Sequence, residues 1–292
     1  MDFNIANEIY NQIFSKINHG NIDLFLCGGA STKEKKSVRD QIKDGLIVNS
    51  KLSILYPEDL FMEMLSRKKY DLLTLERFLA NNSDVILIVC ESPGSFTELG
   101  AFVNNRETLE KVVVLIKTKY KNAKSFIMQG PVAYVKANNK NNVIFYNNDI
   151  DEAIENINKY FRITFGIGTS RKKKEMNKDI DLITGQYTFI ALLLYFFRRI
   201  AIKDLSMYIK ELYSSKGFAI ENKDLIYASA VRRLFKEGLI KKEESRDNNK
   251  FYLLTDRGLY FVDKFLSNVN IENRTRIIDG IRLRILEKSI NN

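Results

Sequence analysis

Glu98 stands one turn inside an expected helix that begins after a Pro-Gly turn and follows the strongly apolar run at 85–90. A carboxylate held there can attack a sugar C1′, or stabilise its charge, as the base departs, because ribosyl transfer passes through a cationic, oxocarbenium-like state. The backbone N–H groups at the helix start, together with serine hydroxyls, can hold an anion or ribose hydroxyls. The pattern predicts N-glycosidic bond cleavage with Glu98 as the catalytic residue and three substrate contacts, Ser92, Gly94 and Ser95.

The run Ser95-Phe96-Thr97-Glu98 also has the composition of a capping box, in which Glu98 would reach back to the Ser95 amide. Capping is therefore the structural alternative for this glutamate. The Gly100-Ala101 pair that follows keeps the helix close to the sheet and leaves a cleft open, which favours the catalytic interpretation.

The sequence offers few residues for other kinds of chemistry. It contains one histidine, His19, and two cysteines, Cys27 and Cys90. These provide neither a Cys/His zinc set nor a His-based triad. We therefore expect no metal and no cofactor, and chemistry that depends on carboxylates, hydroxyls and backbone groups.

Five apolar runs separated by helical patterns surround the candidate glutamate. The expected strands are Ile22–Cys27, Leu52–Leu55, Val85–Cys90, Lys111–Ile116 and Val143–Tyr146. One expected helix begins near residue 33, and three others cover residues 58–67, 72–80 and 150–161. Continuously apolar strands of this kind indicate a parallel sheet buried on both faces. The predicted class is α/β, a doubly wound five-stranded sheet of flavodoxin-like or Rossmann-like type, whose ligands bind at the carboxyl ends of the strands.

The second half changes character. Helical patterns cover about 185–199, 203–213, 222–237 and 259–266, and a hairpin with a charged tip lies between the last two. This order predicts an α+β winged helix-turn-helix domain whose third helix contacts nucleic acid, although winged helices also dock proteins. The predicted organisation is an enzyme domain at 1–161, a basic linker at 162–180 and a nucleic-acid-binding domain at 181–292.

The net charge of +10 is unevenly distributed. Acidic and basic residues balance in residues 1–159, so the excess lies entirely in 160–292. A basic half of this kind indicates a module that faces a polyanion, and a solvated basic surface is the alternative. The candidate nucleic-acid contacts on the third helix and the hairpin are Arg232, Arg233, Lys236, Lys241, Lys242 and Lys250.

The sequence shows no sign of membrane contact. No apolar run approaches the roughly 20 residues that a membrane helix needs. The opening Met1-Asp2-Phe3-Asn4 has no basic region followed by an apolar core, as a secretory signal would. We expect a cytoplasmic protein without a membrane partner.

Several segments of the first half are recognisable as a set. The Glu-Leu-Gly-Ala run after the Pro-Gly turn resembles nucleoside deoxyribosyltransferases and, more fully, the deoxyribosyltransferase-like effectors of bacterial retrons. The segments that recur there are Phe25–Gly29, Tyr56–Phe61, Leu72–Glu76, Glu91–Phe102, Asn104-Asn105, Lys124–Ile127 and Gly130–Val132. The resemblance spans most of residues 22–135, and those effectors also carry a basic C-terminal winged-helix-like domain.

The resemblance implies roles for particular residues. Glu98 occupies the position of the catalytic glutamate, Gly28 and Gly29 form a turn that faces phosphate or ribose, and Glu58 and Asp59 contact the substrate. The alternatives are a plain Gly-Gly turn and, for Asp59, a charge that complements the helix dipole.

One position departs from the enzymes that exchange bases between free nucleosides. Those enzymes carry an aspartate six residues before the nucleophile, where this chain has Ser92. The departure puts exchange between free nucleosides in doubt and favours hydrolysis of a larger nucleotide, such as NAD.

The residues and the resemblance together predict a toxic N-glycosidase effector of a retron anti-phage defence system. It would cleave the ribosyl–base bond of NAD or a related nucleotide, under the control of a reverse transcriptase and its msDNA, the DNA-linked RNA that the basic domain would bind. Shared active sites in such enzymes imply a homo-oligomer, at least a dimer. The alternatives are a nucleotide-sensing DNA-binding regulator and a housekeeping nucleoside deoxyribosyltransferase.

Overall fold

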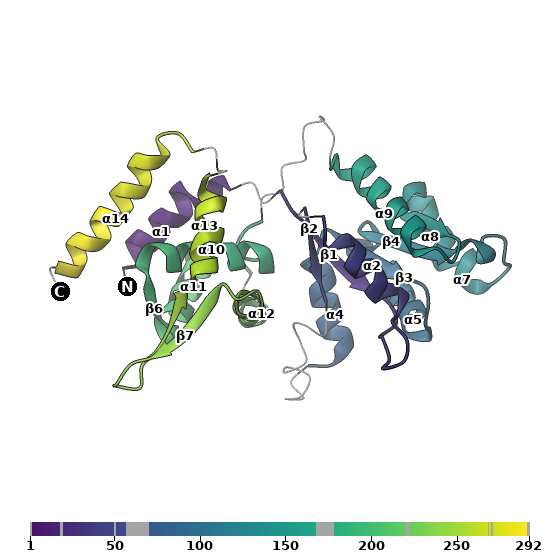
Figure 1. Cartoon of the computed structure of the whole chain (residues 1–292), viewed down its shortest axis with the longest axis horizontal. Helices are drawn as coiled ribbons and strands as arrows, with labels where there is room; N and C mark the ends of the chain where they lie inside the picture. Colours follow the sequence, from purple (N-terminus) through teal and green to yellow (C-terminus); the bar gives the residue numbers. More distant parts are fainter. Residues whose placement is uncertain are drawn as a thin grey trace. The chain divides into compact units, whose positions relative to one another are not determined.

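The structure, a computed structural model, divides into two compact units (Figure 1). The α/β unit comprises residues 20–174, and the helical unit comprises residues 1–19 together with 175–292. The residues that the structure describes are 2–17, 20–49, 51–56, 70–167, 178–219, 222–267, 269 and 271–290.

The α/β unit is built on five parallel strands in the order β2-β1-β3-β4-β5. The strands are β1 (Ile22–Cys27), β2 (Leu52–Leu55), β3 (Val85–Val89), β4 (Val112–Lys117) and β5 (Val143–Tyr146). Every residue of β1 and β3 is buried, as a sheet covered on both faces requires. The predicted α/β class and its five-stranded parallel sheet are confirmed.

The helices of the α/β unit pack against the sheet and against one another. They are α2 (Val38–Leu46), α4 (Leu72–Asn81), α5 (Pro93–Val103), α6 (Arg106–Leu109), α7 (Phe126–Gln129), α8 (Pro131–Asn138) and α9 (Ile150–Phe165), with 3₁₀ turns η2 (Thr118–Tyr120) and η3 (Lys140–Asn142). α2 packs against α9, whereas α5 packs against β3, β4 and α8. Because parallel crossovers are right-handed, α2 and α5 lie on opposite faces of the sheet. The helix expected at 58–67 lies outside the described residues.

The strand order changes direction between β1 and β3. The chain leaves β1 for β2 on one side and returns to β3 on the other. Loops that diverge at such a switch point leave a crevice at the carboxyl ends of the strands. Cys27 lies opposite Ile88, so the turn after β1 and the segment after β3 begin side by side.

The helical unit combines helices with a small antiparallel sheet in the order β6-β8-β7. Its elements are α1 (Phe3–Gln12), η1 (Phe14–Lys16), α10 (Ile183–Phe197), β6 (Arg199–Ala201), α11 (Ile202–Lys216), α12 (Lys223–Lys236), β7 (Ile240–Glu244), β8 (Lys250–Leu254), α13 (Asp256–Ser267) and α14 (Arg274–Ile290). The hairpin that contains β7 extends beyond the helices (Figure 1). α1, η1, β6 and α14 are additional to the expected elements.

α10 is the central helix of this unit. Every residue from Ile183 to Phe196 is buried, which explains why its sequence is apolar all round. Around it lies a continuous hydrophobic cluster with residues from α1, α11, α12 and α13. Within the described part of the chain, no helix has the length and apolarity needed to cross a bilayer.

The N-terminal helix belongs to the helical unit, although the enzyme domain was expected to begin at residue 1. The rings of Phe14 and Phe189 lie 5.2 Å apart, and the Tyr10 hydroxyl donates to the Asp179 carboxylate at 2.7 Å. The first 19 residues of the predicted 1–161 domain are therefore assigned differently, because the periodicity of an amphipathic helix does not identify the core that covers it. Residues 168–177 of the expected linker lie outside the described residues.

Candidate functional site

Two serines hold the turn that leads to Glu98. Ser92 is the N-cap of α5, and its Oγ accepts a hydrogen bond from the N–H of Ser95 at 3.3 Å. In return, the Ser95 Oγ accepts from the N–H groups of Glu91 and Ser92, at 3.2 and 3.1 Å. The capping box therefore joins Ser92 to Ser95, and the alternative with Ser95 as N-cap and Glu98 as its partner is wrong. Glu98 lies instead in the second turn of α5.

Ser95 differs from its expected role as a substrate contact. Its side chain is fully buried, and its hydroxyl also donates to the Ser92 carbonyl at 2.8 Å. The structure thus places Ser95 inside the turn, where it secures the start of α5. Proline at the first position of the helix adds to this stability, since its φ is already helical.

Glu98 is half-buried, and its charge acts on Cys90 at the end of β3. Its Oε2 atom is buried from solvent. Burial, and then the charge of Glu98, raise the pKa of the Cys90 thiol to about 12. Cys90 is therefore neutral at pH 7 and is no nucleophile, whereas the Glu98 carboxylate lies within electrostatic range of the carboxyl edge of the sheet.

Glu91 organises the site, although the sequence analysis did not single it out. Its carboxylate accepts hydrogen bonds from the N–H groups of Gly29 at 3.1 Å, Val38 at 2.8 Å and Arg39 at 2.9 Å. A negative charge at the start of α2 also complements the helix dipole. The sequence signal that could have identified Glu91 is its position as an acidic residue directly after the most apolar strand.

The Gly-Gly turn after β1 has a structural reason for its composition. A Cβ at Gly28 would lie 2.8 Å from the Cβ of Arg39, and one at Gly29 would lie 3.3 Å from the Glu91 side chain. The N–H of Gly29 is donated to Glu91. The expected turn is thus present, but this N–H already has a carboxylate partner and does not await a phosphate.

A cavity of about 390 Å³ opens at the carboxyl ends of β1, β3 and β4. Its described lining residues are Gly29, Ala30, Thr32, Lys35, Lys36, Ser37, Val38, Gln41, Cys90, Glu91, Ser92, Phe96, Lys117 and Tyr120. Gly29 and Ser92 are therefore the predicted contacts that line it. The predicted residues that lie elsewhere in the described part are Gly28, Gly94, Ser95 and Glu98. Two further predicted contacts, Glu58 and Asp59, lie outside the described residues.

The lining combines cations with aromatic rings. Lys35, Lys36 and Lys117 bring three ammonium groups to the cavity, and Lys36 also pairs with Asp44. Ammonium groups attract phosphate, and the rings of Phe96 and Tyr120 offer apolar surface to a flat or sugar-like group. The cavity can therefore accommodate a phosphorylated ligand that carries a ring.

Tyr146, the last residue of β5, lies beneath this edge of the sheet. It is 1% exposed, and within the described structure its hydroxyl has no hydrogen-bond partner. Burial, and then the charge of Glu91, raise the pKa of Tyr146 to about 12. In the sequence, this residue is recognisable only as part of a strand, because no local signal marks a buried polar group here.

Asp40 fastens the loop that forms one wall of the cavity. It accepts hydrogen bonds from the hydroxyls of Tyr56, at 2.8 Å, and Ser31. Burial acts to raise the pKa of Asp40, but these two hydrogen bonds, together with the charges of Arg39 and Lys43, outweigh it and hold the pKa below its usual range. A carboxyl with a lowered pKa stabilises the fold above its unfolded pKa of about 3.9, and this contribution disappears as the pH falls through the folded pKa.

We expect Asp40→Asn to lower the melting temperature by about 3 °C at pH 7, because one charge-assisted hydrogen bond is worth about 1 kcal/mol. At about pH 3, below the unfolded pKa, the difference from the parent protein should be smaller, because the stability contributed by a carboxyl with a lowered pKa is lost progressively as the pH falls. Thermal unfolding of both proteins at the two pH values measures this. A difference that is unchanged by pH would contradict the assigned role.

In the helical unit, the structure corrects the expectation for Arg233. Its Nε lies 2.8 Å from the Glu237 carboxylate, and its Nη1 donates to the Thr184 hydroxyl at 3.0 Å. Its guanidinium also lies 4.5 Å from the centre of the Tyr187 ring. Arg233 therefore joins α12 to α10 and is engaged within the helical unit. Its pair with Glu237 follows the i,i+4 spacing of α12, whereas its link to Thr184 spans 49 residues and could not be read from the helical pattern.

The other basic candidates have different surroundings. Lys236, Lys242 and Lys250 are exposed, and Arg232 is half-buried. Lys241 is exposed and pairs with Glu243 at 2.9 Å on the same strand. Since side chains alternate along a strand, Lys241 and Lys242 lie on opposite faces of the small sheet.

Two substitutions separate these roles. Arg233→Gln should lower the free energy of unfolding by about 1 kcal/mol, because the link from α12 to Thr184 on α10 is lost, while the partly exposed Glu237 keeps its hydrogen bond from the Tyr187 hydroxyl. Lys236→Gln should leave stability unchanged but reduce the slope of log affinity for nucleic acid against log salt by about one. Thermal unfolding and salt-dependent anisotropy titrations measure the two effects. An unchanged salt slope for Lys236→Gln would remove this lysine from the interface.

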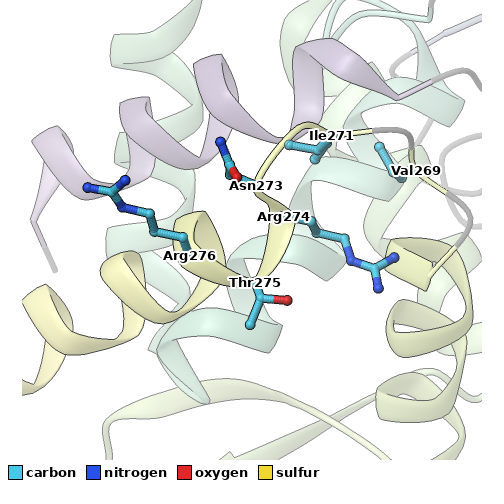
Figure 2. A pocket seen from close by; sticks show the side chains of 6 residues that line it. All are labelled: Val269, Ile271, Asn273, Arg274, Thr275 and Arg276. Carbon is cyan, nitrogen blue, oxygen red and sulfur yellow. The ribbon is translucent and has the colours of Figure 1, made fainter.

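A second hollow lies where the chain enters α14. Its described lining comprises Val269, Ile271, Asn273, Arg274, Thr275 and Arg276. The side chains of Arg274 and Arg276 point in different directions (Figure 2), and Arg274 donates to the carbonyls of Leu266 and Ser267 at 3.0 and 2.9 Å. Because its cations do not converge, this hollow lacks the geometry of an anion site.

Comparisons with known proteins extend over both units. The family model of the STM3845 retron effector protein matches residues 35–242. A protein of retron Ec86 from Escherichia coli is 30% identical over 274 residues, which cover 91% of this chain and 84% of that protein. A protein of retron Ec73 from the same organism is 31% identical over 139 residues, 46% of this chain and 44% of that protein. Both bear the provisional name of a ribosyltransferase/DNA-binding protein.

Proposed function

The chain belongs to the family of STM3845 retron effector proteins, and from this premise we propose that it is the N-glycosidase effector of a retron anti-phage defence system. Its α/β unit cleaves the bond between ribose and base in NAD or a related nucleotide. Its helical unit binds the msDNA of the retron together with the reverse transcriptase, and this complex controls the activity.

The position of Glu98 is the observation that supports the enzymatic assignment. The capping box leaves this glutamate in the second turn of α5, and its charge reaches Cys90, which lines the cavity at the sheet edge. A carboxylate beside such a cavity can approach the anomeric carbon of a ligand bound there. The names of the two relatives, which refer to ribosyl transfer, agree with this chemistry.

The reaction follows from these groups. As the C1′–N bond breaks, its electron pair goes to the base, and positive charge develops on C1′ and the ring oxygen. Glu98 either stabilises this charge or bonds to C1′. Water then attacks C1′, forms the new C1′–OH bond and releases a proton, and where Glu98 had bonded to C1′ that bond breaks and its electron pair returns to the carboxylate. Lys35 and Lys117 hold the phosphate of the substrate, which favours a nucleotide over a free nucleoside.

The helical unit supports the nucleic-acid assignment. Its order of α10, β6, α11, α12, β7, β8 and α13 supports the assignment as a winged helix-turn-helix, in which α12 would be the recognition helix and β7–β8 the wing. The excess positive charge of the chain lies in residues 160–292. Phosphate contacts through Lys236, Lys242 and Lys250 then provide affinity that decreases with salt. We place this protein in the cytoplasm, as a dimer or larger homo-oligomer.

The test is to incubate the protein with NAD, deoxynucleotides and free nucleosides, with and without the retron reverse transcriptase and msDNA, and to measure released base by chromatography. Base release from a nucleotide that requires Glu98 supports the proposal. Binding without turnover would indicate a nucleotide-sensing regulator. Exchange between two free nucleosides would indicate a housekeeping deoxyribosyltransferase.

A further inference from the structure

An aromatic surface lies between α12 and the wing of the helical unit. Phe235, near the end of α12, is 38% exposed. Its ring meets the ring of Tyr252 on β8 edge-on, with centroids 5.4 Å apart and planes at 72°. The contact with Tyr252 holds the Phe235 ring in place, yet more than a third of the side chain remains open to solvent.

Exposed lysines lie on the three elements that carry or adjoin these two rings. Lys242 on β7 lies directly opposite Tyr252 in the antiparallel register, so both side chains stand on the same face of the sheet. Lys236 follows Phe235 on α12 and is exposed. Lys250 stands on that face two residues before Tyr252, opposite Glu244, the acidic residue of this surface. We call the surface made by Phe235, Tyr252, Lys236, Lys242 and Lys250 the stacking surface.

The chemistry of this surface distinguishes two forms of nucleic acid. A duplex is read at its base edges by groups that donate or accept hydrogen bonds, and a phenyl ring has none. An unpaired base presents a flat face, which stacks on aromatic side chains, while lysines neutralise the adjacent phosphates. We propose that the stacking surface binds a single-stranded segment of nucleic acid, with an unpaired base stacked on Phe235. This inference rests on the proposed nucleic-acid binding of the helical unit and specifies the form of strand that it prefers.

The absence of tryptophan from the chain permits a direct test. Phe235→Trp in the full chain introduces a single tryptophan, which can be excited selectively over the tyrosines and which stacks as the parent ring does. Tyr260→Trp is the matched control, because Tyr260 on α13 is 68% exposed and is not part of the stacking surface. The probes are a mixed-sequence deoxyoligonucleotide of about 20 nucleotides, long enough to fill one binding site, and the same strand annealed to its complement.

We expect the single strand to quench the emission of Phe235→Trp and to leave that of Tyr260→Trp unchanged. In anisotropy titrations, Phe235→Leu should bind the single strand about tenfold more weakly, with an unaltered salt slope and duplex binding within about twofold of the parent. Lys242→Gln should instead reduce the salt slope for the single strand by about one.

The outcomes distinguish the failure of the stacking surface from the failure of the proposed nucleic-acid binding by the helical unit. Binding of the single strand without quenching of Phe235→Trp, or equal losses of single-strand and duplex binding in Phe235→Leu, would overturn the stacking surface and leave nucleic-acid binding intact. Failure of the parent protein to bind either probe would overturn both. Should Phe235→Leu unfold early in a thermal scan, the emission of the tryptophan variant still decides.

Discussion

Glu98→Gln should reduce the rate of base release by about a thousandfold or more, since removal of a catalytic carboxylate commonly costs this much. Glutamine has nearly the same shape and is a good helix former, so α5 should remain intact. Its neutral amide can neither bond to C1′ nor stabilise the positive charge that develops there. Chromatography of the released base under single-turnover conditions, with circular dichroism to verify the fold, measures the effect.

Two further variants sharpen this prediction. Glu98→Asp keeps the negative charge, but its side chain is one methylene shorter and its carboxylate lies farther from C1′. The rate of base release should therefore fall between those of the parent and Glu98→Gln. Glu110→Gln removes an exposed glutamate of the same unit and should retain full activity. If Glu98→Gln kept its rate within about tenfold of the parent, Glu98 would not be the catalytic residue.

Glu91→Ala should have the largest effect on the stability of the α/β unit. It leaves the N–H groups of Gly29, Val38 and Arg39 without their carboxylate. An unsatisfied buried donor costs about 1–3 kcal/mol, and water will reach some of these groups, so we expect a loss of about 3 kcal/mol in the free energy of unfolding. Activity should also fall, because the same three residues position the Gly-Gly turn and α2 beside the cavity.

The two compact units can unfold separately, so a local measurement is the better readout. Hydrogen exchange at the Val38 and Arg39 amides should accelerate in Glu91→Ala, and the amides of β4 should be affected less. Glu110→Ala serves as the exposed control and should change neither. Unaltered exchange at the start of α2 would contradict the anchoring role of Glu91.

Local pattern accounts for much of the fold. The bounds of β1, β2 and β5 agree with the predicted runs. These runs are mostly apolar because a parallel sheet covered on both faces buries most of its side chains. The buried helix α10 was recognisable for the same reason, since a helix surrounded by protein has no polar face. The turn into α5 was visible because Pro-Gly and serines have strong backbone preferences.

Long-range contacts account for the remainder. Glu91 lies 62 residues from Gly29, Arg233 lies 49 residues from Thr184, and α1 packs into a core made mainly by the opposite end of the chain. Neither hydrophobic periodicity nor capping chemistry contains information about partners so far apart. The strands, the helices and the candidate glutamate therefore followed from the order of residues, whereas the anchoring of the turn by Glu91, the engagement of Arg233 and the place of α1 arose only when separate segments packed together.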